Sequence, residues 1–222
     1  MAYILNIETA TRNCSVSIAK DGDVIICKEV AEQGYSHAEK LHVFIEAVLQ
    51  ESKLSFSDLD AIAVSQGPGS YTGLRIGVSA AKGLCYALNI PLIAVDTLAV
   101  LAAQVSVEDG LIIPLIDARR MEVYSAVFDA NHFKKRAIAA EIVTADSFAG
   151  YSQTLYFVGD STEKCKEVLN QDNFIFLEEI VFPSANEMGD LSYEQYQNND
   201  TVDVAYFEPY YLKDFLTTAK KV

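Results

Sequence analysis

The order of the elements expected in the first hundred residues constrains the fold more than any other feature of the sequence. Three runs of strand character open the chain, at residues 3–8, 14–20 and 24–30. The dipeptide Asp21-Gly22 joins the second and third runs, and such a dipeptide between two strands predicts a β-hairpin. Helices and strands then alternate, with helices expected at 36–51, 74–88 and 97–105 and strands at 59–66 and 91–95. This order predicts an α/β layer with a mixed sheet.

The second half of the chain repeats this order in part. Strands are expected at 110–117, 122–129, 133–143, 155–159 and 174–177, and helices at 162–170 and 187–197. Because three strands lead each half, the order of elements indicates an internal structural duplication, although residue identities do not repeat. We therefore expect two related lobes, residues 1–103 and a shortened repeat at 104–222 whose tail can pack back on the first lobe.

Charge limits what the chain can bind by itself. Its 17 Lys and Arg residues and 31 Asp and Glu residues give a formal net charge of −14 at pH 7. Such a surface repels phosphate backbones, so we expect no autonomous binding of nucleic acid. The N-terminal residues include no basic segment and reach Glu8 too early for a signal peptide. No apolar run near a terminus is long enough for a membrane span, so we expect a cytoplasmic protein.

Neither the cysteines nor the histidines have the spacing of a metal site. The cysteines are scattered singly, at Cys14, Cys27, Cys85 and Cys165. They are expected to be small buried side chains in a reducing compartment. His37 and His42 are five residues apart on an expected helix and miss the i, i+4 spacing of a helical metal pair, and His132 lies far from both in sequence.

The segment Gly67-Pro-Gly-Ser-Tyr-Thr-Gly73 lies between an expected strand and an expected helix. Backbone N–H groups at such a helix N-terminus suit an anion. However, the segment lacks the third glycine of the dinucleotide-binding motif and the Gly-Lys-Ser/Thr of a P-loop. The interpretation that we favour is that glycine allows a turn and close packing, because Gly73, Gly77 and Ala81 form a stripe of small residues that another helix could approach closely.

Glu8 ends the first expected strand and is followed by the hydroxyl residues Thr9 and Thr11. A carboxylate and hydroxyl groups at a strand end can approach a metal–phosphate group. A carboxylate that caps a turn fits the same residues equally well. Together with the glycine segment they define a candidate vestigial anion or nucleotide site, which consists of Glu8, Thr9, Thr11, Gly67, Gly69 and Ser70. Asp117 and Arg119 lie in a turn between two later strands, where we expect a structural ion pair.

The helix expected at 36–51 begins with a capping box, in which Ser36 is the N-cap and Glu39 follows three residues later. One face of this helix is apolar and is expected to pack on the sheet, through Leu41, Phe44, Ile45, Val48 and Leu49. Val43 and Ala47 lie nearly opposite, which gives the helix a second apolar patch. This patch is either buried within the chain or part of a surface for another protein.

Four sequence blocks occur in order along the chain: Ile4-x-x-Ile-Glu-Thr-Ala-Thr11, Gly67-Pro-Gly-Ser-Tyr-Thr-Gly-Leu-Arg-Ile-Gly77, Asp117-Ala-Arg119 with Glu122-Val-Tyr124, and Glu208-Pro-Tyr-Tyr-Leu212. Together they resemble the TsaB family, also called YeaZ, over nearly the whole chain. The resemblance implies an actin/Hsp70/sugar-kinase-like (ASKHA) fold, in which two related lobes contain mixed β-sheets flanked by helices. It also implies a role in making N6-threonylcarbamoyladenosine next to the anticodon of tRNAs, as an accessory subunit without catalysis of its own.

The resemblance further implies partners. They are a catalytic TsaD-type subunit and a TsaE-type ATPase, on which ATP and metal are expected, while tRNA would be bound only through the complex. No cofactor is expected in this chain itself. In the family, first-lobe helices pair with TsaD or with a second copy of TsaB, and the residues expected to bind a partner are His37, Leu41, Val43, Phe44, Ala47, Gly73, Arg75, Gly77 and Ala81.

One stretch separates this chain from TsaD-type enzymes. Those enzymes contain His-Met-Glu-Gly-His, whose two histidines bind metal, after the strand that follows the glycine-segment helix. The corresponding stretch here is Ile93–Leu101, with Thr97 and Leu101 at the histidine positions. Neither residue supplies imidazole, so we expect no metal site. The alternatives are a small phosphotransferase or ATPase with its own active site on the same fold, and a metallopeptidase, which would need a ligand pair that the sequence does not show.

Overall fold

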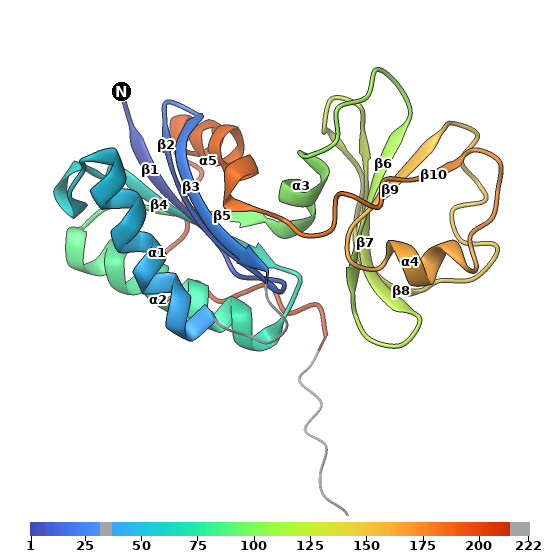
Figure 1. Cartoon of the computed structure of the whole chain (residues 1–222), viewed down its shortest axis with the longest axis horizontal. Helices are drawn as coiled ribbons and strands as arrows, with labels where there is room; N and C mark the ends of the chain where they lie inside the picture. The colour runs from blue at the N-terminus through green and yellow to red at the C-terminus, as the bar shows by residue number, and fades with distance from the viewer. Residues whose placement is uncertain (32–36, 214–222) are drawn as a thin grey trace, which may run out of the picture.

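The computed structural model describes residues 1–31 and 37–213, which form two five-stranded sheets in separate halves of the molecule (Figure 1). The strands of the first sheet are β1 (Tyr3–Glu8), β2 (Asn13–Lys20), β3 (Asp23–Ala31), β4 (Ala61–Gly67) and β5 (Leu92–Asp96). Those of the second sheet are β6 (Leu111–Asp117), β7 (Glu122–Asp129), β8 (Lys134–Ile142), β9 (Leu155–Val158) and β10 (Phe174–Phe176). The α-helices are α1 (His37–Ser52), α2 (Tyr71–Leu88), α3 (Thr97–Ala102), α4 (Thr162–Lys166) and α5 (Met188–Gln197).

The two sheets have the same topology. The strand order is β3-β2-β1-β4-β5 in the first sheet and β8-β7-β6-β9-β10 in the second. Strand β1 pairs antiparallel with β2 and parallel with β4, and β6 pairs in the same way with β7 and β9. The predicted structural duplication is therefore confirmed, and the loop after β1 corresponds to the loop after β6.

The β2–β3 hairpin forms at the predicted dipeptide. Asp21 and Gly22 both have positive φ angles, 53° and 99°, and Lys20 pairs with Asp23 across the turn. Two central residues with positive φ are typical of a type I′ turn, whose twist matches that of the strands it joins.

Both faces of the first sheet are covered, which explains the nearly continuous apolar run of β1. Leu5 and Ile7 point to the face on which α1 and α2 pack, and Ile4 points to the opposite face, on which α3 and α5 pack. Figure 1 shows α1 and α2 on one side of this sheet and α5 on the other. The side chains buried on the inner face of α1 include the predicted Leu41, Ile45, Val48 and Leu49.

The predicted start of α1 is not tested, whereas that of α2 differs from the structure. The predicted N-cap of α1, Ser36, lies outside the described residues. Helix α2 begins at Tyr71, three residues before the predicted start. The reason is that the Ser70 hydroxyl accepts a hydrogen bond from the Gly73 N–H at 3.3 Å and so caps the helix within the glycine segment.

Helix α3 lies between the two sheets (Figure 1). Its Val100 side chain packs with Ile93 of the first sheet, whereas Leu98 and Leu101 pack with Ile112 of the second sheet. A short helix that is apolar on most sides is therefore buried on most sides, and it joins the two hydrophobic cores.

The chain returns to the first sheet after it has completed the second. Met188 of α5 packs in the same cluster as Ile93, and the Val202 N–H donates to the Leu92 carbonyl at 2.9 Å. Further along, the Lys82 ammonium group of α2 donates to the Phe207 carbonyl at 2.8 Å. The C-terminal segment therefore lies on the first sheet and its helices, although it follows the second sheet in sequence.

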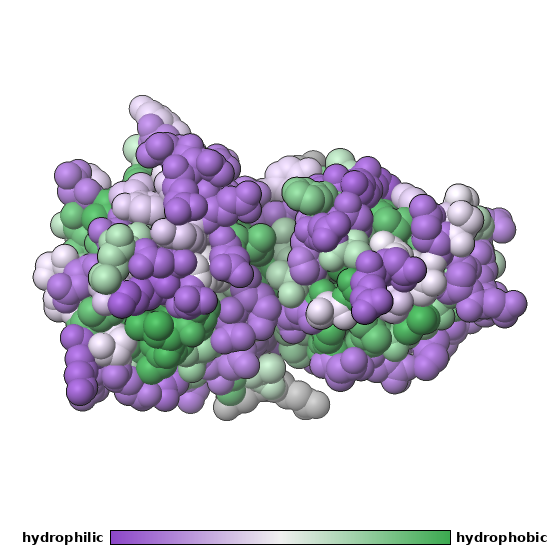
Figure 2. Space-filling model, turned by 90° about the horizontal axis from the view of Figure 1, so that it is seen from above, coloured by the Kyte–Doolittle hydropathy of each residue, from purple (hydrophilic) through white to green (hydrophobic). Residues whose placement is uncertain are grey.

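Hydrophilic residues cover much of the face seen in Figure 2, with apolar areas in both halves. Within the described residues, no helix is long and apolar enough to cross a bilayer. The four cysteines are free, and Cys14, Cys85 and Cys165 are buried as predicted. Cys27 is only partly buried, contrary to the prediction, because it lies on β3, which is an edge strand.

Candidate functional site

The loop after β1 and the glycine segment are tied together next to the second lobe. The Ser70 N–H donates to the Ala10 carbonyl at 2.6 Å, and the Thr9 hydroxyl donates to the Gly73 carbonyl at 2.8 Å. These hydrogen bonds hold the loop against the first turn of α2, so that the ends of β1 and β4 present one continuous surface.

Glu8 is buried under this loop. Its side chain has no contact with solvent, and one carboxylate oxygen accepts a hydrogen bond from the Ala10 N–H at 2.5 Å. The other oxygen has no hydrogen-bond partner among the described residues. Burial raises the pKa of Glu8 to about 7, against the opposing effects of the Ala10 hydrogen bond and of the neighbouring Ser65 hydroxyl. Of the two interpretations open for Glu8, this geometry favours the carboxylate that caps a turn.

A cavity of about 340 Å³ opens between the two lobes. The first lobe contributes the loop after β1 and the start of α2, and the second lobe contributes the β6–β7 turn and the residue that follows Gly159. The C-terminal segment contributes the remaining wall. The lining residues are Ala10, Thr11, Arg12, Pro68, Gly69, Ser70, Tyr71, Thr72, Ile116, Asp117, Ala118, Arg119, Tyr124, Asp160, Tyr210, Tyr211, Leu212 and Lys213.

Only part of the predicted anion or nucleotide site lines this cavity. The predicted residues that do so are Thr11, Gly69 and Ser70. Glu8 and Thr9 do not, because both are buried behind the loop. Gly67 does not either, because it lies against the Tyr210 carbonyl, to which a Cβ atom on Gly67 would approach within 2.7 Å. The cavity therefore brings together only three of the six predicted residues.

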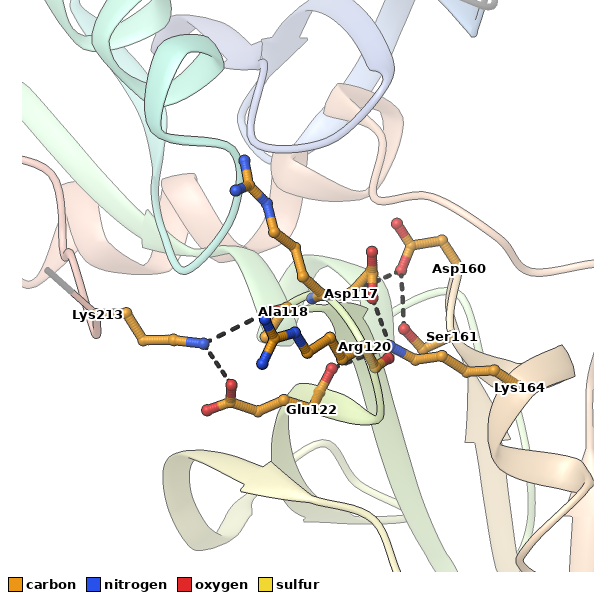
Figure 3. A network of polar contacts seen from close by, with 9 residues as sticks. Asp117, Ala118, Arg120, Glu122, Asp160, Ser161, Lys164 and Lys213 are labelled. Carbon is orange, nitrogen blue, oxygen red and sulfur yellow. Dashed lines mark hydrogen bonds and ion pairs between the residues drawn. The ribbon is translucent and has the colours of Figure 1, made fainter. Parts of the chain in front are cut away.

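Ion pairs fix the second-lobe side of the cavity (Figure 3). Lys164 of α4 pairs with Asp117 and donates to the Glu122 carbonyl at 3.0 Å. Lys213 pairs with the Glu122 carboxylate, which ties the C-terminal segment to the second lobe. The predicted ion pair between Asp117 and Arg119 is wrong, because Asp117 pairs with Lys164 instead. Arg119 instead donates its backbone N–H to Asp117 at 3.1 Å.

Thr97 and Leu101, which the resemblance places at the histidine positions of TsaD-type enzymes, are buried in this structure. Thr97 is buried, and its hydroxyl accepts a hydrogen bond from the Gly67 N–H at 3.0 Å. Leu101 is buried in the core of the second sheet. Across residues 1–31 and 37–213, no group of three or more His, Cys, Asp or Glu side chains is arranged to hold a metal ion.

Most of the residues predicted to bind a partner are buried within the chain. A Cβ atom on Gly73 would lie 2.1 Å from the Thr9 carbonyl oxygen, and one on Gly77 would lie 2.2 Å from the Thr9 hydroxyl oxygen. The stripe of small residues therefore allows close packing, as we favoured, but within the chain itself, against the β1 loop and, at Gly73, also against His37 of α1. The predicted partner-binding residues that the chain itself covers are His37, Leu41, Gly73, Gly77 and Ala81.

The outer sides of α1 and α2 carry the other predicted residues. Val43 is 57% exposed, so the second apolar patch of α1 is not buried within the chain. Phe44 and Ala47 are partly exposed, and Arg75 of α2 is exposed. Tyr86 of α2, which no sequence pattern indicates, is 85% exposed. The two helices contact each other, and we call Val43, Phe44, Ala47 and Tyr86 the outer helical face. Phe44 lies at its edge, because it also packs against the first core, as the inner stripe of α1 predicts.

Sequence reasoning also missed several residues of the interlobe cavity. The duplication could have indicated Asp160. This residue follows Gly159 at the end of β9, just as Pro68 follows Gly67 at the end of β4. The two glycines have nearly the same φ angle, 115° and 117°. Lys213 reaches the cavity only through the tertiary fold, and the one sequence signal near it was the block that ends at Leu212.

Comparison with known proteins identifies the family of this chain. The family model described as TsaD, tRNA N6-adenosine threonylcarbamoyltransferase, matches residues 26–216. The Escherichia coli (strain K12) tRNA threonylcarbamoyladenosine biosynthesis protein TsaB is 29% identical over 220 residues, which are 95% of this chain and 94% of that protein. The tRNA N6-adenosine threonylcarbamoyltransferase of Bacillus subtilis (strain 168) is 38% identical over 112 residues, which are 44% of this chain and 32% of that protein.

Solved structures agree with the family. YeaZ from Pseudomonas aeruginosa has a TM-score of 0.83 at 25% identity and covers 96% of this chain and 100% of that chain. Component A of Acidaminococcus fermentans (R)-2-hydroxyglutaryl-CoA dehydratase has a TM-score of 0.52 at 10% identity, covers 88% of this chain and 99% of that chain, and bears on the fold alone. Together with the duplicated sheets, these likenesses confirm the predicted ASKHA-like fold. Since the family model matches most of the chain and the TsaB and YeaZ relatives match nearly all of it, the chain belongs to the TsaD family and, within it, to the TsaB (YeaZ) proteins.

Proposed function

We propose that this chain is an accessory, scaffold-type subunit required for N6-threonylcarbamoyladenosine modification of tRNA next to the anticodon. It acts by dimerising with a catalytic TsaD-type subunit and by working with a TsaE-type ATPase. The partners bind ATP and metal, and tRNA binds through the complex. The pathway is supported by the Escherichia coli relative, which is named as a tRNA threonylcarbamoyladenosine biosynthesis protein.

The observation that carries the proposal is the outer helical face. Val43 and Tyr86 are 57% and 85% exposed on two helices that contact each other. Partly buried apolar side chains of the same two helices, Phe44, Ala80 and Leu84, pack against the first core. Exposed aromatic and branched apolar side chains are typical of the centre of a protein interface, where burial removes them from water.

A TsaD-type subunit fits this face because it shares the family fold. It would present an equivalent pair of first-lobe helices, and two such pairs can pack around a pseudo-twofold axis. A second copy of the chain can occupy the same face around a true twofold axis, which makes a homodimer the expected competitor of the complex with TsaD.

Packing at the two histidine-equivalent positions supports the assignment of catalysis to the partner. The Thr97 hydroxyl is engaged by the Gly67 N–H, and Leu101 fills the second core. A metal site at these positions would require new ligands and would open a buried core. The proposal therefore assigns threonylcarbamoyl transfer to the TsaD-type subunit.

Co-purification tests the proposal. A tagged TsaD-type subunit co-expressed with this chain should retain it in equal amounts, and the homodimer of the isolated chain should dissociate when the TsaD-type subunit is added. Failure of the two proteins to associate would contradict the proposal. Saturable ATP turnover by the purified chain alone would favour the alternative, a small phosphotransferase or ATPase.

A further inference from the structure

Three buried oxygen atoms on one face of the first sheet have no hydrogen-bond partner among the described residues. They are Asn6 Oδ1, Glu8 Oε2 and Ser65 Oγ, and all three residues are fully buried. Alternate residues of a strand point to the same face, so Asn6 and Glu8 of β1 lie on the face of Ile4, and Ser65 of β4 lies on it too. We call these three residues the buried polar cluster. Unpartnered polar groups are rare in protein interiors because each one costs free energy, so the cluster requires an explanation.

The buried polar cluster has too few hydrogen-bond donors. The Asn6 amide is fixed in orientation, because its Nδ2 donates to Ser17 Oγ at 3.1 Å and Ser17 in turn donates to the Ala185 carbonyl at 2.6 Å. Its Oδ1 is therefore an acceptor, as is an ionised Glu8 carboxylate, and the Ser65 hydroxyl has a single hydrogen to donate. A proton on Glu8 adds a second donor. The cluster therefore favours the neutral form of Glu8 for as long as water is kept out.

The loop after β1 separates the buried polar cluster from the interlobe cavity. Ala10 and Thr11 line the cavity, whereas Glu8 is buried behind them. The Ala10 N–H donates to the Glu8 carboxyl group at 2.5 Å, and the Ala10 carbonyl accepts the Ser70 N–H at 2.6 Å. Ala10 therefore connects the buried carboxyl group directly to the start of α2.

The contacts that hold this loop against α2 are mostly polar. The Thr9 hydroxyl donates to the Gly73 carbonyl at 2.8 Å. On the side of α2, the loop meets glycines, since a Cβ atom on Gly69 would overlap the Ala10 carbonyl oxygen and one on Gly73 would overlap that of Thr9. Local opening occurs where few apolar contacts must be broken. The loop can therefore leave α2 while the sheet beneath it stays folded.

The other titratable side chains near the loop do not change charge where Glu8 does. Burial and the Glu8 charge raise the pKa of the Cys14 thiol to about 11. His37 Nε2 donates to the Thr11 carbonyl at 2.7 Å, and burial lowers the pKa of His37. Both side chains are therefore uncharged from about pH 6.5 to about pH 8. Among the described residues, burial, Ala10 and Ser65 shift the pKa of Glu8, and no charged group does.

We propose that Glu8 is a proton-operated latch for the loop after β1. With its proton, the carboxyl group keeps the loop closed against α2. When the O–H bond ionises and the proton passes to solvent, the carboxylate is drawn to water, which reaches it only if the loop opens. The opened segment carries Ala10 and Thr11, so the first-lobe wall of the cavity opens with it. The inference does not depend on the proposed accessory role, because the latch lies within one chain.

Hydrogen exchange of single amides in the full chain, followed by NMR and corrected for the intrinsic rate at each pH, tests the inference. The Ser70 N–H, which donates to the Ala10 carbonyl, reports the closed loop, and the Ile62 N–H, which donates to the Pro91 carbonyl at 3.1 Å, reports the first sheet. Ser70 should be protected about tenfold less than Ile62, because the loop opens without the sheet. Its protection should fall about tenfold from about pH 6 to about pH 8.

Two glutamate variants assign this pH dependence. Glu8→Gln keeps the size of the side chain and always carries a donor, so the protection of Ser70 should differ by less than about twofold between the two pH values. Glu46→Gln, at an exposed position of α1, is the matched control and should keep the tenfold difference, which is about that of the unaltered chain. A Glu8→Gln variant that keeps the full pH dependence would overturn the inference.

Two readouts in the unaltered chain keep the inference testable even if Glu8→Gln does not fold. If Ser70 and Ile62 are equally protected at both pH values, then the loop opens only when the whole chain unfolds, and there is no latch. The chemical shift of the Ala10 N–H, which donates to Glu8, should titrate near pH 7. A constant Ala10 shift across that pH would equally overturn the inference.

Discussion

At the scale of single residues, Glu8 makes the stability of the chain depend on pH. Burial raises its pKa from 4.5 to about 7, so between these values the folded chain holds a proton that the unfolded chain has released. The free energy of unfolding therefore falls as pH rises through this window, because ionisation leaves a charge buried without a cation. A shift of this size corresponds to about 3 kcal/mol.

We expect Glu8→Gln to remove most of this fall in the free energy of unfolding at higher pH. In urea unfolding at about pH 5 and about pH 8, the unaltered chain should be less stable at the higher pH, and the difference should be much smaller in the variant. Glu46→Gln, which changes an exposed glutamate of α1, is the matched control and should keep the original difference. Equal pH dependence in all three proteins would contradict the assignment of the window to Glu8.

The close approach of α2 to the β1 loop gives a second residue-scale prediction. Gly77→Ala places a Cβ atom where the Thr9 hydroxyl oxygen now lies, 2.2 Å away, and should lower the free energy of unfolding by about 1–3 kcal/mol. Gly83→Ala on the same helix meets nothing within 4 Å and should raise stability by up to about 1 kcal/mol, because alanine favours helix. Chemical denaturation measures both, and a Gly77→Ala variant as stable as Gly83→Ala would show that the loop moves aside at no cost.

At the scale of elements, helix α1 has one face that packs on the hydrophobic core and an opposite face that is exposed. Val43→Glu should leave the monomer folded, because the new carboxylate stays hydrated at a site that is 57% exposed. It should weaken association with a TsaD-type partner by a few kcal/mol, since docking would bury an unpaired charge. Ile45→Glu, at a position 2% exposed, is the contrasting variant and should unfold the monomer.

Thermal melting and analytical ultracentrifugation, with and without the partner, measure these two effects separately. If Val43→Glu folds and binds as tightly as the unaltered chain, then the partner surface lies elsewhere than the outer helical face. A large fall in the melting temperature of Val43→Glu would instead mean that its side chain contributes to the core.

Elements could be predicted from the sequence where local patterns decide their form. The apolar run of β1, the Asp21-Gly22 turn and the inner stripe of α1 each follow from periodicity or turn chemistry within a few residues. The predicted start of α2 is three residues too late, because the capping hydroxyl of Ser70 lies inside a segment whose sequence is typical of a loop. The stripe at Gly73 and Gly77 could be recognised as close packing, but its partner, the Thr9 loop, is distant in sequence.

At the scale of the whole molecule, the duplication determines where a ligand can meet both lobes. Two sheets of the same topology bring the ends of β1 and β6 to one cavity, and the returning C-terminal segment completes its wall. Arg12 and Lys213 of this cavity could not be predicted, since no local pattern marks a side chain that acts across lobes. The order of elements predicted the two lobes, whereas the residues between them required the tertiary structure.

The measurement that tests the central claim most directly is reconstitution of tRNA modification from purified subunits, with each subunit omitted in turn. The complete mixture of this chain, a TsaD-type subunit, a TsaE-type ATPase, tRNA and the small substrates should form N6-threonylcarbamoyladenosine. Omission of this chain should abolish the product, and this chain alone should form none. Full activity without the chain, or transfer to tRNA by the chain alone, would contradict the account of an accessory subunit that works through its partner.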